Sequence, residues 1–345
     1  MALNQSCWVL GGFRSGIWRL GKNSSSEVCG SRPGEHWIEM TQSMSGLDVV
    51  FSSDRFCVHH LATAVTSLLE TNLSLVARLW VMTNASESRP VRRFQDDVRK
   101  RYGLEPGALQ VDEQQFDRVY VSGHVSWATY ARFLLGELLP LDARRVLYLD
   151  SDLIVVGPLD GILDCSAVAS GQIRPIVQAV PRDSGHHLQE FGFRSDRYFN
   201  AGVLLVDLEQ WRREGIQNQL FQRAEQLFGK LHLWDQDVLN FGLEEKWSEL
   251  PGHLNEPALE KWSEDARIVH FVGGTKPWMV VGRHPYRDEY QRYRSLTPFW
   301  PYVPEGLGRY LRKRLLPRPL QRPKKTLRRM GRRIRRLVGG AITRR

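Results

Sequence analysis

Between residues 48 and 150 the chain alternates short apolar runs with longer stretches of helical periodicity. Residues 48–54, 77–83 and 145–150 have the composition of buried strands, and residues 59–70 and 91–102 have the apolar spacing of helices. Strands that alternate with helices of this length are typical of βαβ units and a mainly parallel sheet. Ligands of such sheets bind beyond the carboxyl ends of the strands, so polar residues that follow strands are the first candidates for a site.

Two shorter segments continue this alternation. Residues 109–111 are expected to form a third strand, and residues 129–139 a helix that Pro140 ends. Gly103 is expected to end the helix at 91–102. The sequence contains no internal repeat and neither a G-x-G-x-x-G nor a Walker loop between a strand and a helix. The α/β class is therefore predicted without the common nucleotide-binding signatures.

Asp150 and Asp152 close the strongest predicted strand. In extended backbone, residues i and i+2 point to the same face, so both carboxylates can converge on one divalent cation. Burying two carboxylates directly after an apolar strand costs folding free energy unless a cation or a hydrogen-bond donor pairs with them. The alternative is a polar turn with a capping aspartate, and this common spacing does not decide between the two interpretations.

Residues 266–278 form a second candidate segment, a strand that runs into a glycine-rich turn. Backbone N–H groups in this turn, next to Lys276, suit a diphosphate. His270 could be a third metal ligand, although a lone histidine at a strand end is more often a satisfied core residue. Two carboxylates and one imidazole would favour Mn²⁺, because Mg²⁺ prefers oxygen ligands.

Two polar motifs precede apolar residues. Asn200, Ala201 and Gly202 lie before a buried strand, and Trp234–Asp237 precedes the next apolar pair. Their local interpretation is turn and helix-capping chemistry, which we favour for Asp237.

The formal net charge of +10 is unevenly distributed along the chain. Residues 301–345 contain 16 Lys and Arg against one acid, so residues 1–300 carry a net charge of −5. The protein is therefore not generally basic. Residues 1–46 are rich in Gly and Ser and contain no apolar stretch long enough for a signal peptide. We interpret them as a flexible extension, or as an over-extended start with translation from Met40 or Met44.

The cysteines and the apolar runs exclude further classes. The four cysteines have no C-x-x-C spacing, which predicts reduced thiols in a cytoplasm rather than a zinc or disulfide scaffold. No apolar run approaches the length of about 18 residues that a transmembrane helix needs.

The basic C-terminal segment has a helical apolar stripe. Leu327, Met330, Ile334 and Leu337 recur at steps of three and four among arginines. A basic amphipathic segment suits an anionic membrane surface, at about 1 kcal/mol for each Lys or Arg near the headgroups. The alternative is a solvated tail or a tail that binds RNA.

Four motifs occur in the order found in glycosyltransferase family 8: Tyr148–Asp152, Tyr198–Gly202, Asp235–Asp237 and His270–Trp278. Residues 47–285 resemble this family, which includes bacterial lipopolysaccharide α-glucosyl- and α-galactosyltransferases and the glycogenins. The resemblance implies a single nucleotide-diphospho-sugar transferase domain of the GT-A type, with a mixed, mainly parallel central sheet. This catalytic domain would span residues 47–300, between a flexible extension at 1–46 and a basic membrane-association tail at 301–345.

The resemblance also implies roles for individual residues. Asp150, Asp152 and His270 match the Mn²⁺ ligands, with Mg²⁺ as the alternative ion. Gln236 and Asp235 match residues at the transferred sugar. Nine residues match donor contacts: Ser52, Asp54, His124, Arg132, Ser151, Asn200, Ala201, Gly273 and Lys276.

One departure concerns the nucleoside end of the donor. Arg55 and Phe56 stand where family members often have an acid and an asparagine, which leaves the base and ribose contacts open. An acid that the family has near Asp183 has no secure counterpart.

The implied activity is metal-dependent, retaining transfer of glucose or galactose from its UDP-sugar to a cell-envelope glycan such as a lipopolysaccharide core, forming an α-linkage. The acceptor would be a glycan or glycolipid at the cytoplasmic face of the plasma membrane, where the tail attaches peripherally. One alternative is a glycogenin-like or soluble-acceptor transferase. Another is a nucleic-acid-binding protein, but the acidic body argues against it and no nucleic-acid partner is expected. The intact Asp150, Asp152 and His270 argue against a catalytically silent relative.

Overall fold

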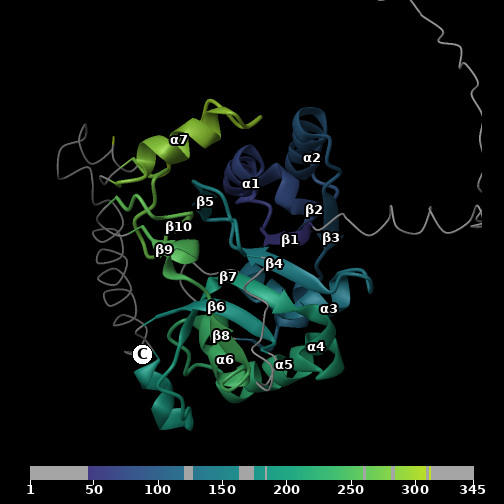
Figure 1. Ribbon diagram of the computed structural model, residues 1–345, viewed down its shortest axis with the longest axis vertical. Coiled ribbons are helices and arrows are strands. Elements are labelled where there is room, and N and C mark those ends of the chain that lie inside the picture. Colours follow the sequence, from purple (N-terminus) through teal and green to yellow (C-terminus); the bar gives the residue numbers. More distant parts are fainter. Residues whose placement is uncertain are drawn as a thin grey trace, which may run out of the picture. The chain divides into compact units, whose positions relative to one another are not determined.

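A seven-stranded sheet runs through the described part of the chain (Figure 1). Its order is β3 (Gly107–Gln110), β2 (Val76–Thr83), β1 (Leu47–Ser52), β4 (Arg145–Leu149), β7 (Phe199–Asp207), β6 (Val177–Pro181) and β8 (Trp247–Glu249). Strand β1 is parallel to β2 and β4, β2 to β3, and β6 to β8. Strand β7 is antiparallel to both of its neighbours, β4 and β6. The predicted mixed, mainly parallel sheet is confirmed.

The structure is a computed structural model, and it describes residues 46–119, 127–162, 175–182, 185–258, 262–280, 284–307 and 311. The described residues belong to the unit that runs from Ser45 to Arg345. The predicted extension before Gly46 and the tail after Leu311 lie outside them. No helix within the described ranges is both long enough and apolar enough to cross a bilayer.

A second, three-stranded sheet contains β5 (Leu153–Val155), β10 (Ile268–His270) and β9 (Glu256–Pro257). Strand β5 follows β4 after only Asp150, Ser151 and Asp152. It is antiparallel to β10, and this register places His270 opposite Leu153. The short connection therefore brings the end of β10 to the carboxyl end of β4.

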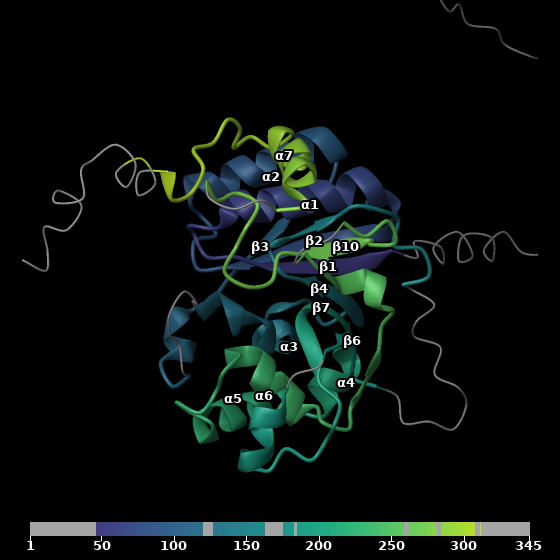
Figure 2. The ribbon, with the colours of Figure 1, turned by 90° about the vertical axis from the view of Figure 1, so that its left-hand side faces the viewer.

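Helices cover both faces of the main sheet (Figure 2). On one face lie α1 (Val58–Asn72), α2 (Arg89–Tyr102) and α7 (Arg287–Ser295), and on the other lie α3 (Leu135–Leu138), α4 (Leu208–Arg213), α5 (Ile216–Gln226) and α6 (Trp234–Gly242). Successive β1 residues alternate between these layers: Val49 and Phe51 pack with α1 and α2, whereas Val50 packs with the opposite layer. Because both faces are buried, the strands are apolar throughout.

Of two helices predicted from the sequence, one ends where expected and the other has a different form. Helix α2 ends where predicted, because Gly103 adopts φ +70° and donates its N–H to the carbonyl oxygen of Arg99. The predicted helix at 129–139 is wrong in form: the chain makes 3₁₀ turns at Trp127–Thr129 and Ala131–Leu134, followed by the short α3. Every residue of 130–135 is buried, so the segment has no solvent-facing stripe to support a surface helix.

Candidate active site

Three segments meet at the carboxyl end of β4. The loop Asp150–Asp152 leaves β4, and the antiparallel β7 places its first residues beside that loop. The N–H of Asp150 donates to the carbonyl oxygen of Gly202 at 2.9 Å. Strand β10 brings His270 from the third segment. Sheet topology therefore gathers residues that are far apart in the sequence.

The structure brings together the three residues predicted as metal ligands. The Nε2 atom of His270 lies 3.2 Å from Oδ1 of Asp152 and 3.7 Å from Oδ2 of Asp150. One ligand atom from each residue lies within 4.8 Å of the others. The Nδ1 atom of His270 lies 3.2 Å from Oδ1 of Asn200 and 3.1 Å from Oδ1 of Asn255. These contacts orient the ring so that Nε2 faces the acids, as outer-shell partners do for metal ligands.

Gly202 makes this close approach possible. A Cβ atom at this position would lie 2.1 Å from Cε1 of His270 and 3.0 Å from Oδ2 of Asp150. Any other residue would push the imidazole or the carboxylate out of place. The carboxylate–carboxylate–imidazole set that results fits a divalent cation.

Lys276 supplies a positive charge at the same place. Its Nζ atom lies 2.8 Å from Oδ2 of Asp152, and it also donates to the carbonyl oxygen of Phe271. Burial raises the pKa of Asp152, but Lys276 and His270 outweigh it and hold that pKa below its usual range. Lys276 follows a turn in which Gly273 has φ +77°, a conformation that favours glycine. The carboxylate of Asp152 thus already binds one cationic group.

Arg132 is buried between two carboxylates. Its Nη2 atom donates to Oδ1 of Asp150 at 2.8 Å, and its Nε atom lies 3.0 Å from Oδ2 of Asp235. Further bonds run to the carbonyl oxygens of Thr129 and Ala201. Burial lowers the pKa of Arg132, but Asp150 and Asp235 outweigh it and raise that pKa. Burial also raises the pKa of Asp235 to about 6, although Arg132 opposes this.

The side-chain amide of Gln236 is held on both sides. Its Oε1 atom accepts from Nδ2 of Asn200 at 2.9 Å and from the N–H of Ala201 at 3.0 Å. Its Nε2 atom donates to the hydroxyl of Tyr198 at 3.1 Å. The adjacent Asp235 accepts from Oγ1 of Thr129 at 2.5 Å. The predicted sugar-side residues Asn200, Ala201, Asp235 and Gln236 therefore lie together.

Four other predicted donor contacts have different surroundings. Ser52 is linked to the acids, because its Oγ lies 2.7 Å from the hydroxyl of Tyr148, which donates to Oδ1 of Asp150 at 3.0 Å. Asp54 instead accepts from the N–H groups of Phe56 and Cys57, at 2.9 and 3.0 Å, in the turn before α1. Ser151 is half-buried between the two acids. His124 lies outside the described residues, as does Asp183.

The structure also identifies residues that the sequence did not. Tyr148 precedes Asp150 by two positions in extended chain, so strand periodicity could have placed it on the same face. Asn255 belongs to no motif: it ends the 3₁₀ turn η8 (Gly252–Asn255) and contacts both Asn200 and His270. Only the tertiary structure identifies it.

Asp237 binds the turn before α6, as its turn and capping interpretation predicts, but it is not the N-cap residue. Leu233 occupies the N-cap position of α6, and Asp237 lies within the first turn. Its Oδ2 accepts from the N–H groups of His232 and Leu233, both at 2.8 Å, and its Oδ1 accepts from the hydroxyl of Tyr198 at 2.7 Å. Asp237 therefore fixes Tyr198, the residue that holds the amide of Gln236.

Comparison with known proteins gives a consistent match. Residues 48–281 match the model of a family described as Glycosyl transferase family 8. General stress protein A of Bacillus subtilis is 28% identical over 278 residues, which cover 73% of this chain and 94% of that protein. The lipopolysaccharide 1,3-galactosyltransferase of Salmonella typhimurium is 23% identical over 73% of this chain and 79% of its own length. The structure of galactosyltransferase LgtC with donor and acceptor sugar analogues shares the fold, with a TM-score of 0.64 at 23% identity over 76% of this chain and 99% of that chain.

Proposed function

The chain belongs to glycosyl transferase family 8, and on that premise we propose that it transfers glucose or galactose from a UDP-sugar to a cell-envelope glycan. The observation that carries this proposal is the convergence of Asp150, Asp152 and His270 beside Lys276. The relative named as a lipopolysaccharide galactosyltransferase supports a lipopolysaccharide core as the acceptor. In this proposal the new bond is an α-linkage and the anomeric configuration is retained.

The site matches the electrostatic needs of a diphosphate leaving group. As the bond between the sugar C1 and the phosphate oxygen breaks, negative charge develops on the UDP oxygens. Asp150, Asp152 and His270 would hold the Mn²⁺ or Mg²⁺ ion, which would supply Lewis-acid stabilisation of that charge. The ammonium of Lys276 and the N–H groups of the turn at Gly273 would add preorganised positive potential. No protein acid is then needed to protonate the leaving group.

Lys276 links metal binding to donor binding in this proposal. Its ammonium contacts Oδ2 of Asp152, one of the three residues that would hold the cation. Lys276 would then share Asp152 with the cation, and repulsion between the two positive charges would weaken its ion pair with that carboxylate. The lysine would then be available to the diphosphate of the donor.

We propose that Gln236 and Asp235 position the sugar and do not attack it. A neutral amide is a poor nucleophile, and the amide of Gln236 is already engaged on both sides. The carboxylate of Asp235 is engaged by Thr129 and Arg132. The acceptor hydroxyl would then attack C1 from the face that the diphosphate leaves. Its proton would pass to a departing phosphate oxygen.

We further propose that residues 301–345 attach the enzyme peripherally to the cytoplasmic face of the plasma membrane. The 16 basic residues of this segment and its apolar stripe support an anionic lipid surface. An acceptor such as a glycolipid would lie at that surface. The long basic segment has no evident use in the alternative of a glycogenin-like or soluble-acceptor transferase.

A release assay tests the activity. The full chain, treated with chelator, is incubated with a panel of UDP-sugars, and UDP release is measured before and after addition of Mn²⁺ or Mg²⁺. We expect release from UDP-glucose or UDP-galactose only after metal is restored, with Mn²⁺ more effective than Mg²⁺. Release that is equally fast in chelator would contradict the metal assignment. Absence of release from every UDP-sugar tested, with or without an added glycan acceptor, would contradict the proposed activity.

A further inference from the structure

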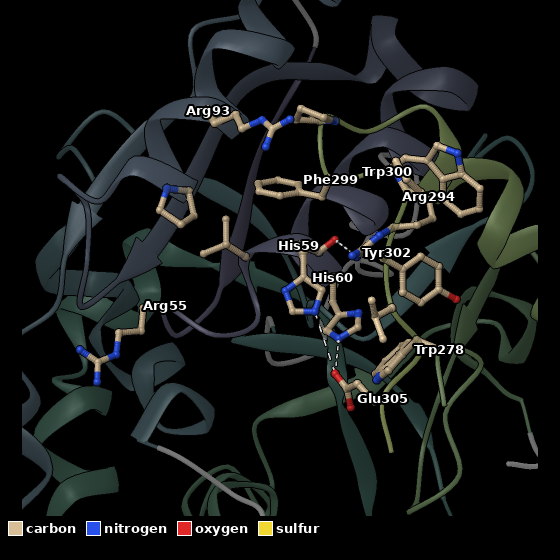
Figure 3. A pocket seen from close by; sticks show the side chains of 15 residues that line it. Arg55, His59, His60, Arg93, Trp278, Arg294, Phe299, Trp300, Tyr302 and Glu305 are labelled. Carbon is tan, nitrogen blue, oxygen red and sulfur yellow. Dashed lines mark hydrogen bonds and ion pairs between the residues drawn. The ribbon is translucent and has the colours of Figure 1, made fainter. Parts of the chain in front are cut away.

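A second cluster of metal-ligating side chains lies on the α1 face, at the wall of a cavity of about 430 Å³ (Figure 3). His59 and His60 belong to the first turn of α1, and Glu305 comes from the segment after α7. The Nε2 atoms of His60 and His59 lie 3.1 and 4.0 Å from the same oxygen, Oε1 of Glu305. One ligand atom from each residue lies within 4.8 Å of the others. The proposed transfer reaction uses none of the three.

We propose that His59, His60 and Glu305 bind a Zn²⁺ ion, distinct from the cation at Asp150, Asp152 and His270. Two histidines and one glutamate are an established zinc ligand set, with a water as the fourth ligand. The cavity beside the cluster leaves room for that water.

The distances between the ligand atoms suit this ion. Bonds of about 2.0–2.1 Å in tetrahedral geometry place ligand atoms about 3.3 Å apart. The separation between His60 and Glu305 already has this value within a few tenths of an ångström. The imidazole of His59 must approach Glu305 by about 0.7 Å from its present 4.0 Å. It can do so because its side chain is 32% exposed at the start of a helix.

One of the three ligands is also oriented by an outer-shell partner. Nδ1 of His60 lies 2.7 Å from the hydroxyl of Tyr290, which leaves Nε2 directed at Glu305. Such partners fix ring orientation and tautomer in zinc sites.

A simple hydrogen bond between His60 and Glu305 does not account for the whole arrangement. That bond satisfies His60 but gives His59 no reason to face the same oxygen. The two imidazoles lie with their centroids only 4.0 Å apart. A shared ion explains why both Nε2 atoms are directed at one carboxylate.

The buried guanidinium of Arg294 lies at the same cavity, but its contacts are not with the side chains of the cluster. Arg294 of α7 is 2% exposed and faces the same cavity. Its Nη1 atom donates to the backbone oxygen of His59 at 2.5 Å, and its guanidinium lies over the ring of Tyr302. Arg55 and Arg93 also line the cavity and lie over the rings of Phe56 and Phe299. These charges weaken cation affinity, so we expect a specific site of moderate strength.

The proposed ion would connect the Lys276 turn to the start of the basic tail. Glu305 forms a β-bridge with Met279, and its N–H donates to the carbonyl oxygen of Trp278 at 3.1 Å. The ring of Trp278 packs on His60 with centroids 3.9 Å apart. Because Trp278 follows Lys276 by two positions, an ion on Glu305 would hold that turn and the segment entering the tail against α1.

Metal titration of the full chain tests the proposal, using Asp152→Asn to silence the other site. The chelator-treated protein is titrated with Zn²⁺ against a chromophoric chelator, and with Co²⁺ while the visible absorption is recorded. We expect one equivalent of bound metal and the intense absorption of tetrahedral Co²⁺. Glu305→Gln keeps the hydrogen-bond acceptor for His60 but removes the charged ligand. Loss of an outer-shell partner typically lowers metal affinity roughly 10- to 100-fold. Because Glu305→Gln and His59→Gln each remove a direct ligand, each should lower Zn²⁺ affinity by more than that.

The exposed residues Glu264 and His253 supply matched controls. Glu264→Gln and His253→Gln should leave both titrations unchanged, and circular dichroism verifies folding of every variant. Failure of the Asp152→Asn protein to bind an equivalent of Zn²⁺ would overturn the proposal. So would a Co²⁺ spectrum that Glu305→Gln and His59→Gln leave unaltered. Neither result depends on sugar transfer, so the proposed enzymatic function is tested separately.

Discussion

The Nε2 atom of His270 lies 3.2 Å from Oδ1 of Asp152, although 118 residues separate them along the chain. This contact follows from strand pairing: β5 begins directly after Asp152 and runs antiparallel to β10, which ends at His270. The N–H of Phe271 then donates to the carbonyl oxygen of Asp152 at 3.0 Å. The backbone therefore fixes the positions of two candidate ligands before any ion binds.

Asp152→Asn should abolish metal-dependent transfer while leaving the fold intact. The amide keeps the shape of the side chain but loses the charge that faces His270 and Lys276. Since metal stabilisation of a leaving group contributes several kcal/mol, we expect UDP release to fall by at least about 100-fold. Asp160→Asn, at an exposed position eight residues further along the chain, is the matched control and should keep its activity. Near-normal Mn²⁺-dependent release by the Asp152 variant would show that the metal assignment is wrong.

Gly202→Ala tests whether the close approach at β7 builds the metal site. The added Cβ would lie 2.1 Å from the imidazole of His270, so the ring must move away from Asp150 and Asp152. We expect weaker Mn²⁺ binding and a corresponding loss of transfer, measured by titration of the chelator-treated protein. At Gly252 a Cβ meets nothing within 4 Å, so Gly252→Ala is the control that should bind Mn²⁺ normally. Equal Mn²⁺ affinity of the two variants would argue against a ligand role for His270.

Arg132→Met should destabilise the metal-free protein. The variant leaves Asp150 and Asp235 without the guanidinium that lies 2.8 and 3.0 Å from them. Removal of one partner of a buried ion pair typically costs about 3–5 kcal/mol of unfolding free energy. Arg132→Lys should lose less, because it keeps the charge but cannot make all the contacts of the guanidinium. Urea unfolding measures both.

The control for this prediction is Arg118→Met, which removes an arginine that is 84% exposed and pairs with Glu225. Exposed pairs contribute about 0–1 kcal/mol, so little change is expected. An Arg132→Met protein as stable as the control variant would show that the two carboxylates do not need the guanidinium.

The sequence predicted that Asp150 and Asp152 belong to one site because the two residues are neighbours at the end of one apolar strand. Asp150 and Asp152 follow an apolar strand as predicted, but they converge through the short loop between β4 and β5 and not through strand periodicity. The order of strands and helices likewise predicted a mainly parallel sheet, and the family resemblance implied that it is mixed. These features depend on hydrophobic periodicity, which each segment carries by itself.

The parts that could not be predicted depend on contacts between distant segments. Nothing near Asn255 in the sequence indicates that it contacts His270, and the His59–His60–Glu305 cluster joins residues about 245 positions apart. The 3₁₀ turns at 127–134 replace a predicted helix because packing on all sides outweighs local helical spacing. Such features emerge only when the sheet has assembled.

Mass spectrometry under turnover tests the positioning role of Gln236. If attack occurs on the face that the diphosphate leaves, the intact protein should carry no hexosyl adduct on Gln236 or Asp235. Gln236→Ala removes the bonds to Asn200, Ala201 and Tyr198, and it should lower kcat while leaving some activity. Gln226→Ala, at an exposed position on α5, is the control and should behave as the unmodified chain. A trapped adduct on either residue would replace this mechanism with double displacement.

Removal of residues 312–345 should release the protein from anionic vesicles and leave transfer to soluble acceptors intact. The deletion starts after Leu311 because Glu305 contacts His60 and belongs to the described fold. It removes 15 of the 16 basic residues of the tail. Each basic residue near the headgroups contributes about 1 kcal/mol of attraction to anionic lipid. The deletion therefore removes most of the attraction that this segment supplies. Flotation with phosphatidylglycerol vesicles measures binding, and vesicles of neutral phosphatidylcholine are the control. Unchanged flotation of the truncated chain would contradict the membrane role.

Preferential binding of the full chain to RNA over anionic vesicles would favour a nucleic-acid role for the tail instead, because both ligands attract the same charges but only the bilayer uses the apolar stripe.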